Sequence, residues 1–132
     1  LGFLHAQERF FQMDLLRRNA AGELSELFGI LALNHDKAVR VHQFRKRAAR
    51  AFAALSPEDQ TLLQTYTDGV NKGLDELGKA PFEYALLRTE PKPWRVEDAF
   101  LALFSMYIDL QPELDEYGRS LAVLRGEGGA AE

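Results

Sequence analysis

The sequence predicts a chain that is almost entirely α-helical and folds as one domain. Apolar side chains recur every three or four residues along several segments, the spacing that lines one face of a helix. Residues that favour helix starts and helix ends separate these segments. No segment shows the strict alternation of apolar and polar side chains that is typical of a half-buried strand. At 132 residues, the chain has the length of one domain or part of one.

Composition and charge exclude several classes of protein. The chain contains 16 lysines and arginines and 20 aspartates and glutamates, which gives a net charge of −4. Phosphate binding needs clustered positive charge, so we expect no nucleic-acid partner. No apolar run approaches the roughly 20 residues that cross a bilayer, so we expect no membrane partner. Cysteine is absent, which excludes disulfides and thiolate chemistry within this chain.

Both ends of the sequence suggest a processed or trimmed piece of a longer protein. The chain begins with Leu1 rather than methionine, and a helical pattern starts at once without a signal peptide. At the other end, residues 126–132 read GEGGAAE, a segment that buries too little apolar surface to stay ordered. We therefore expect a helical domain over residues 1–125 and a flexible glycine-rich tail over 126–132.

Two helices are expected before Gly29, a residue that can adopt the left-handed conformation that ends a helix. The second of them pairs Leu24 with Leu27 at i, i+3 spacing. The stripe of the first helix is expected to comprise Leu4, Phe11, Leu15 and Arg18, and Phe10, Met13 and Leu16 should widen its apolar side.

A third helix is expected over residues 36–55, after a cap at Asn34 or Asp36. Its basic cluster lies mostly on the side away from the core and has no interleaved aromatic residues, so we interpret it as a solvated face. The face that should contact the core comprises Val41, Phe44, Ala48, Phe52 and Leu55. The basic cluster comprises Arg45, Lys46, Arg47 and Arg50.

The clearest helix start in the chain is the run Ser-Pro-Glu-Asp at residues 56–59. Serine accepts hydrogen bonds from first-turn N–H groups, proline fits the first helical position, and acidic residues favour the positive end of the helix dipole. This helix should end at Gly78. Gly69 and Gly73 inside it each cost about 1 kcal/mol relative to alanine, and they mark either close packing or simple tolerance. Its apolar face should comprise Leu63, Tyr66, Val70, Leu74 and Leu77.

A proline-rich connection precedes the last long helix. Pro91 and Pro93 exclude regular helix locally, and Trp94 should anchor the connection by burying its ring. Asp98 suits the first turn of the helix that follows and that Pro112 interrupts. A helix with apolar residues on so many sides is buried or lines a pocket. Its apolar residues are Phe100, Leu101, Leu103, Phe104, Met106, Tyr107, Ile108 and Leu110.

No catalytic constellation stands out in this sequence. His5, His35 and His42 lack the i, i+4 pairing and partner glutamate of a helical zinc site, so we interpret each as structural or exposed. No nucleophile elbow or phosphate-binding glycine loop occurs. The acidic cluster Glu113, Asp115 and Glu116 is either a charged helix start or a source of oxygen ligands for Ca²⁺, with the remaining ligands on another chain. We assign no catalytic residue to the chain.

Four blocks of sequence resemble the α chain of penicillin acylases, in the same order. Residues 2–18, GFLHAQERFFQMDLLRR, resemble the family pattern G-[YF]-x-x-A-Q-[DE]-R-[LF]-[FW]-Q-M-[DE]-x-x-R-R. Residues 22–29, GELSELFG, resemble the stretch that follows it. The third block runs from ALSPED at residues 54–59 to YTDGVN at 66–71. The fourth is Pro-Trp at 93–94 followed by Asp98, and the agreement extends to about Leu124.

The resemblance implies the helical α-subunit portion of an αββα N-terminal-nucleophile hydrolase heterodimer. In this family an exported precursor cuts itself into a smaller α and a larger β chain. The serine that begins the β chain attacks the carbonyl of an N-acyl amide, and its own α-amino group acts as the base. The resemblance therefore implies cleavage of β-lactam antibiotics or acyl-homoserine lactones, a periplasmic or secreted location, no organic cofactor, and no nucleophile on this chain.

The resemblance also implies the site residues. The positions that match the family's acyl-binding segment are Met106, Tyr107, Leu110 and Gln111, which form either a pocket wall or ordinary core. Leu110 and Gln111 stand where the best-known penicillin G acylases have arginine and phenylalanine, so a phenylacetyl preference is not implied. Glu116 is the nearest match to a glutamate that binds one structural Ca²⁺ shared with the β chain, and Glu113 lies close to the same register.

Two other functions compete with the amidohydrolase subunit. One is a non-catalytic helical interaction module derived from this family, which would leave an apolar face exposed on a stable monomer. The other is a helical regulator that binds nucleic acid, and the acidic net charge argues against it.

Overall fold

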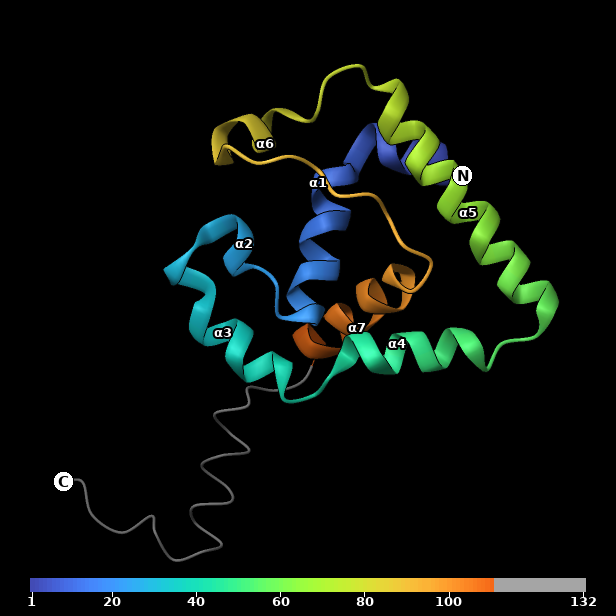
Figure 1. Ribbon diagram of the computed structural model, residues 1–132, viewed down its shortest axis with the longest axis horizontal. Coiled ribbons are helices and arrows are strands. Elements are labelled where there is room, and N and C mark those ends of the chain that lie inside the picture. Colours follow the sequence, from blue (N-terminus) through green and yellow to red (C-terminus); the bar gives the residue numbers. More distant parts are fainter. Residues whose placement is uncertain (111–132) are drawn as a thin grey trace, which may run out of the picture.

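The computed structural model describes residues 1–110 of the chain. Within them the chain forms seven helices and no strand, which confirms the predicted fold class (Figure 1). None of these helices is both long enough and apolar enough to cross a membrane. The helices are α1 (Gly2–Ala21), α2 (Ser25–Phe28), α3 (Ile30–Arg40), α4 (Phe44–Ala53), α5 (Pro57–Glu76), α6 (Phe82–Leu87) and α7 (Asp98–Leu110).

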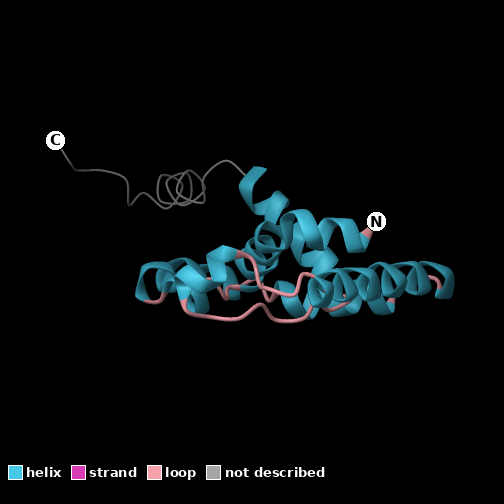
Figure 2. Ribbon diagram, turned by 90° about the horizontal axis from the view of Figure 1, so that it is seen from above, coloured by secondary structure: helices cyan, strands magenta, loops and turns pink. Residues whose placement is uncertain are grey.

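Helix α1 lies at the centre and packs against α5 on one side and α7 on the other (Figure 1). Helix α4 contacts α7, while α2 and α3 pack together beside the C-terminal half of α1. The view at right angles shows a flattened arrangement of helices joined mostly by short loops (Figure 2). One buried cluster comprises Ala6, Phe10, Met13, Val70, Tyr84 and Trp94, and a second comprises Ala20, Ala48 and Leu101.

The buried face of α1 agrees with the prediction only in part: Phe10 and Met13 are buried as expected, but the central stripe is not. Leu4 is 58% exposed, and Phe11 and Leu15 are only partly buried, so of that stripe only Arg18 is buried. The helix departs from helical geometry at Arg9, with φ −149° and ψ 29°, which changes the phase of its faces. Contacts with both α5 and α7 then bury two sides of the helix. The residues buried are Gly2, Ala6, Phe10, Met13, Asp14, Arg17, Arg18 and Ala20.

The helix expected over residues 36–55 is two helices. Helix α3 ends at Arg40, α4 begins at Phe44, and Gln43 between them has a φ of 51°. Val41, assigned to the core, is 80% exposed because the chain turns there. Asp36 does not cap this helix: it lies inside α3, where its carboxylate accepts from the backbone N–H groups of Leu24 and Ser25 at 3.0 and 2.7 Å. Asp36 therefore caps the neighbouring helix α2.

Helix α5 agrees with its prediction in both position and packing. Ser56 accepts from the N–H of Asp59, and Pro57 opens the helix. Val70 is fully buried, and the other predicted face residues are partly buried. A Cβ added at Gly73 would lie 2.5 Å from the carbonyl oxygen of Phe3, and one at Gly2 would strike the carbonyl of Tyr66. The glycines therefore mark a close crossing of α1 and α5, as one of the two interpretations of the sequence holds.

Candidate functional site

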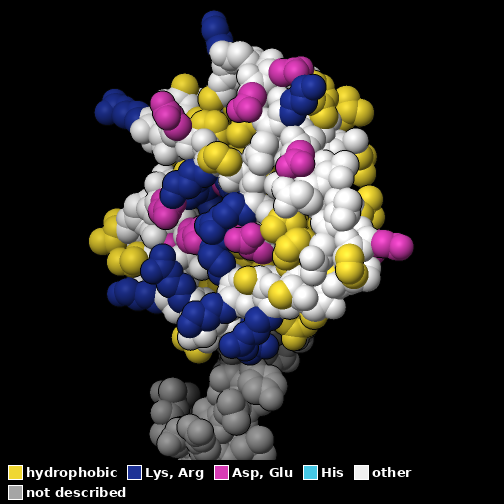
Figure 3. All heavy atoms as spheres, turned by 45° about the vertical axis from the view of Figure 1, so that its right-hand side comes forward, with side chains coloured by type: hydrophobic (Ala, Val, Ile, Leu, Met, Phe, Trp, Pro, Cys, Tyr) yellow, Lys and Arg dark blue, Asp and Glu magenta, His cyan; other side chains and the backbone are white. Residues whose placement is uncertain are grey.

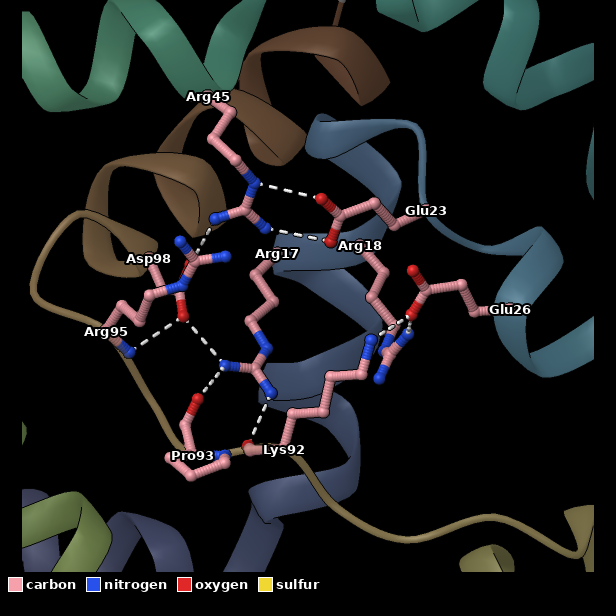
Figure 4. A pocket seen from close by; sticks show the side chains of 9 residues that line it. All are labelled: Arg17, Arg18, Glu23, Glu26, Arg45, Lys92, Pro93, Arg95 and Asp98. Carbon is pink, nitrogen blue, oxygen red and sulfur yellow. Dashed lines mark hydrogen bonds and ion pairs between the residues drawn. The ribbon is translucent and has the colours of Figure 1, made fainter.

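Two features of the described chain converge on helix α7. A network of charged side chains holds the start of the helix, and an apolar groove runs along its outer face. The network lines a cavity of about 440 Å³ between α1, α2, α4 and the connection into α7 (Figure 4). The groove lies between α4 and α7 and has a volume of about 700 Å³.

Asp98 fixes the beginning of α7. Asp98 is buried, and its carboxylate accepts three hydrogen bonds. Oδ2 accepts from the backbone N–H of Arg95 at 2.9 Å and from Nη1 of Arg17 at 2.7 Å, and Oδ1 accepts from Nη1 of Arg45 at 3.2 Å. The hydrogen bond from the backbone N–H of Arg95 is one of the two bonds of a capping box, the one in which an acidic side chain accepts from a backbone N–H three residues earlier. The negative charge also favours the helix N-terminus.

Arg17 joins α1 to the connection that leads into α7. Besides Asp98, its guanidinium donates to Asp14 at 2.7 Å and to the backbone carbonyls of Pro93 and Lys92 at 2.8 and 2.7 Å. Figure 4 shows Arg17 at the centre of the network. The guanidinium carbon also lies 5.1 Å from the ring centroid of Trp94, a cation–π contact. A buried arginine requires such complete pairing, because an unpaired buried charge is costly.

Asp14 is the buried counterpart of Arg17 on α1. It accepts from Arg17, from Nε of Arg18 at 2.9 Å and from the hydroxyl of Tyr84 at 2.7 Å. Burial, and the hydrogen bond to Asp14, raise the pKa of the Tyr84 phenol well above its usual range. Tyr84 therefore stays neutral, and its hydroxyl donates a hydrogen bond to Asp14.

The outer part of the network links α2 and α4 to the same centre. Arg45 donates to both carboxylate oxygens of Glu23, at 2.9 and 2.8 Å, in the bidentate geometry that suits a guanidinium. Glu26 accepts from Arg18 and Lys92, each at 2.6 Å. The hydrogen bond from Lys92 lowers the pKa of Glu26, although burial opposes that change. Arg45 is thus half-buried and paired, which corrects its assignment to a solvated basic face.

The cations and carboxylates of this network are equal in number and pair with one another across several helices. Four cations, Arg17, Arg18, Arg45 and Lys92, face four carboxylates, those of Asp14, Glu23, Glu26 and Asp98. In the space-filling view, Lys and Arg side chains alternate with acidic ones across one face of the molecule (Figure 3). Each of the four carboxylates forms at least one ion pair, so the network ties α1, α2, α4 and α7 together.

The groove beside α7 is apolar and accessible to a ligand. Four apolar residues of α7 recur at i, i+3, i+4 and i+7 and remain largely exposed. Phe44 of α4 and Phe104 of α7 stack with centroids 5.1 Å apart and close one side. Arg47 and Arg50 of α4 complete the lining. The exposed residues are Leu103 (59%), Met106 (54%), Tyr107 (56%) and Leu110 (78%).

Comparison with known proteins identifies the family of this chain. The profile of the penicillin amidase family matches residues 1–131. The chain belongs to the penicillin amidase family. It is 45% identical over 94 residues to the penicillin acylase 2 proenzyme of Pseudomonas sp. strain SE83, which covers 71% of this chain and 12% of that protein.

Other members of the penicillin amidase family match over more of the chain. Penicillin G acylase of Escherichia coli is 30% identical over 123 residues, covering 86% of this chain and 14% of the relative. An acyl-homoserine lactone acylase, QuiP of Pseudomonas putida, is 35% identical over 119 residues, covering 86% and 15%. The chain therefore spans 12–15% of the length of these curated relatives.

The family fold is also seen in a solved structure. The thermostable penicillin G acylase from Alcaligenes faecalis superposes with a TM-score of 0.74 at 24% sequence identity. The match covers 96% of this chain and 71% of that chain. At this identity the likeness shows the fold alone.

The structure brings together three of the four residues that the resemblance assigned to an acyl pocket. Met106, Tyr107 and Leu110 share one face of α7 and line the groove. Gln111, Glu116 and the boundary between residues 125 and 126 lie outside the described residues. Phe44 and Phe104 line the groove too: the sequence placed Phe44 in the core, and placed Phe104 on the helix expected to be buried or to line a pocket. Phe104 belongs to the same apolar helix as Met106 and Tyr107, so its place beside them follows from helical spacing. Phe44 belongs to α4, and the position of α4 beside α7 depends on tertiary packing.

The structure also gives the contacts of the three histidines and bears on the predicted metal site. Nδ1 of His5 lies 2.9 Å from the hydroxyl of Tyr66, and Nε2 of His35 lies 2.6 Å from Oδ1 of Asn19. His42 stacks on Phe44. Within residues 1–110, no group of three or more histidine, aspartate or glutamate side chains is arranged to hold a metal ion. The described residues alone therefore do not fit a calcium site, and no step is assigned to calcium.

Proposed function

We propose that this chain is the α subunit of an amidohydrolase that cleaves the amide bond of N-acyl substrates, β-lactam antibiotics or acyl-homoserine lactones. Its role is to form part of the acyl-binding pocket with the α4/α7 groove. The observation that carries this proposal is an exposed apolar groove on the helix that the family resemblance assigned to acyl binding, in a chain that belongs to the penicillin amidase family.

The chemistry proposed for the complete enzyme needs a second chain. A larger β chain supplies an N-terminal serine, whose hydroxyl attacks the amide carbonyl while its α-amino group accepts the proton. The amine product leaves, and water hydrolyses the acyl-enzyme. The pairing of the four network carboxylates with cations supports this division, because it gives them a role in holding the helices together. The groove holds the acyl group, since its aromatic, aliphatic and thioether side chains offer apolar contact.

Expression of the full coding region tests this proposal. We expect a larger chain with an N-terminal serine to copurify, as intact-mass analysis and N-terminal sequencing would show. The complex should release amine from N-acyl β-lactams or acyl-homoserine lactones, and alanine in place of that serine should abolish release. A complex without amidase activity would support a non-catalytic helical interaction module instead, and light scattering would then show whether the isolated chain associates through its apolar face.

Three further parts of the proposal concern maturation. We propose that the precursor is exported to the periplasm or secreted, cuts itself into the two chains, and binds one Ca²⁺ through Glu116 together with groups of the β chain. Glu116→Gln should lower the calcium content of the purified enzyme or slow the appearance of the two chains. Normal calcium content in this variant would reject Glu116 as a ligand.

A further inference from the structure

A hydrogen bond in the middle of α7 joins this helix to α1, well beyond the ion pair that holds its first turn. Nδ2 of Asn19 donates to Oγ of Ser105 at 2.7 Å. Ser105 is fully buried (0% exposed) and lies one helical turn from Leu101 of the second buried cluster. An unpaired hydroxyl in such a setting is costly, so Asn19 supplies a contact that α7 needs in its present orientation.

The side chain of Asn19 is itself held from outside by α3. Nε2 of His35 lies 2.6 Å from Oδ1 of Asn19. Because an amide oxygen can only accept, Nε2 carries the hydrogen in this contact, and the amide nitrogen of Asn19 is left facing Ser105. A chain of two hydrogen bonds thus runs from an exposed histidine on α3, through α1, to a buried hydroxyl on α7.

Asn19 and Arg17 contact α7 at two points on one face of that helix. Their partners Asp98 and Ser105 are seven residues apart, which is about two turns of helix, so both side chains face α1. A contact at the first turn holds the start of α7 but leaves the rest able to rotate about the helix axis. A second contact two turns later removes that freedom.

The α4/α7 groove lies on the other side of the same helix. At about 100° per residue, the four exposed residues that α7 gives to the groove lie roughly 100–160° around the axis from Ser105. A rotation that broke the bond between Asn19 and Ser105 would therefore move this apolar wall relative to Phe44 on α4. The four residues are Leu103, Met106, Tyr107 and Leu110.

We infer that Asn19 is a positioning residue for the acyl-binding groove, acting through Ser105 and supported from outside by His35. This inference rests on the proposed function and adds to it a determinant of acyl-group specificity that does not touch the substrate. Asn19, Ser105 and His35 do not line the groove as the described residues form it. Their effect on specificity is exerted through the rotation of α7.

Substrate profiles of variants test this inference on the enzyme expressed from its full coding region. The substrates are amides of one amine with straight acyl chains of graded length, and the readout is the kcat/KM ratio of the longest to the shortest chain. Ser105→Ala removes the hydrogen bond from α7, and Asn19→Leu removes it from α1. Each should change the ratio roughly ten-fold, mainly through KM, because an apolar pocket discriminates on the scale of one or two methylene groups.

Four further variants separate positioning from a general loss of stability. Asn19→Leu/Ser105→Ala should change the ratio no more than either single substitution, because both remove the same bond. Asn19→Asp should keep most of the wild-type ratio, since its carboxylate can accept from the Ser105 hydroxyl. His35→Ala should shift the ratio in the same direction as Asn19→Leu, by a smaller factor. Gly73→Ala strains the α1/α5 crossing, so it should lower the melting temperature and leave the ratio unchanged.

The outcomes distinguish this inference from the proposed function. An unchanged ratio in Ser105→Ala, with hydrolysis intact, overturns the inference and leaves the proposed function standing, even where Asn19→Leu fails to fold. Effects of the two single substitutions that multiply in the double variant, or an equal shift in Gly73→Ala, also overturn it. A wild-type enzyme that hydrolyses no N-acyl amide overturns both.

Discussion

Arg17 and Asp98, 81 residues apart in the chain, form a buried ion pair with a nitrogen–oxygen distance of 2.7 Å. Their side chains are 5% and 1% exposed. The pair connects the central helix α1 to the first turn of α7, the helix that carries the proposed acyl-binding groove. The orientation of the groove is therefore set by a contact between two charged residues from opposite ends of the described chain.

Removing one partner of this pair should destabilise the protein strongly. Asp98→Asn leaves the buried charge of Arg17 short of one counter-charge, and we expect a loss of about 3 kcal/mol in the free energy of unfolding. Urea denaturation of the purified enzyme, followed by circular dichroism, measures it. Glu97→Gln is the control, because Glu97 pairs only with the exposed Arg95 at 3.4 Å and should cost less than about 1 kcal/mol. Equal losses in the two variants would contradict the structural role of the pair.

The crossing of α1 and α5 should tolerate no side chain at Gly73. A methyl group there would lie 2.5 Å from the carbonyl oxygen of Phe3 and 3.0 Å from Cβ of Ala6, so Gly73→Ala should cost roughly 2 kcal/mol. At Gly69 the nearest atom is the backbone nitrogen of Phe3, at 3.3 Å, and the gain in helix propensity offsets the contact. In thermal melts, the melting temperature of Gly69→Ala should therefore be well above that of Gly73→Ala. The reverse order would refute the close crossing.

The acid dependence of stability should depend on Glu26. Its pKa is lower in the folded protein than the ordinary value of 4.5, so its contribution is present above pH 4.5 and is lost as the pH falls through the folded pKa. Glu26→Gln should be less stable than the wild type near neutral pH, and the difference should shrink as the pH falls below 4.5. Urea unfolding at a series of pH values measures this. A stability difference for Glu26→Gln that stays constant with pH would reject the assignment.

The groove should determine acyl-chain preference through Tyr107. Its side chain is 56% exposed and lines the groove, so Tyr107→Ala should widen it and shift the optimum of kcat/KM toward longer or bulkier acyl groups. The shift should be on the order of ten-fold, the scale of one or two methylene groups in an apolar pocket. Phe82→Ala removes an aromatic ring that is 70% exposed on α6, away from the groove, and serves as the control. An unchanged acyl-length profile in Tyr107→Ala would remove the residue from the pocket.

Local chemistry allowed most helices to be predicted, but not every face that they bury. The serine–proline start of α5 and its end just before Gly78 each depend on residues within a few positions of one another. The bend at Arg9 and the turn at residues 41–43 do not, and for that reason Leu4 and Val41 were placed on the wrong side. The ordered family motifs likewise located Met106, Tyr107 and Leu110, but gave no reason for Phe44 to join them.

The charge network likewise has one part that the sequence shows and another part that only the tertiary structure shows. The spacing of Asp14, Arg17 and Arg18 is visible in the sequence and permits pairing within one helix. Whether such charges are solvated or buried depends on what packs over them, and their partners Asp98 and Tyr84 come from segments 70–81 residues away along the chain. The sequence by itself determined the helical class, the family and the helix that bears the groove, because these follow from local periodicity and ordered motifs. Only the tertiary structure decided that the signature arginine Arg17 is a buried support for that helix, since burial is a property of the packed chain.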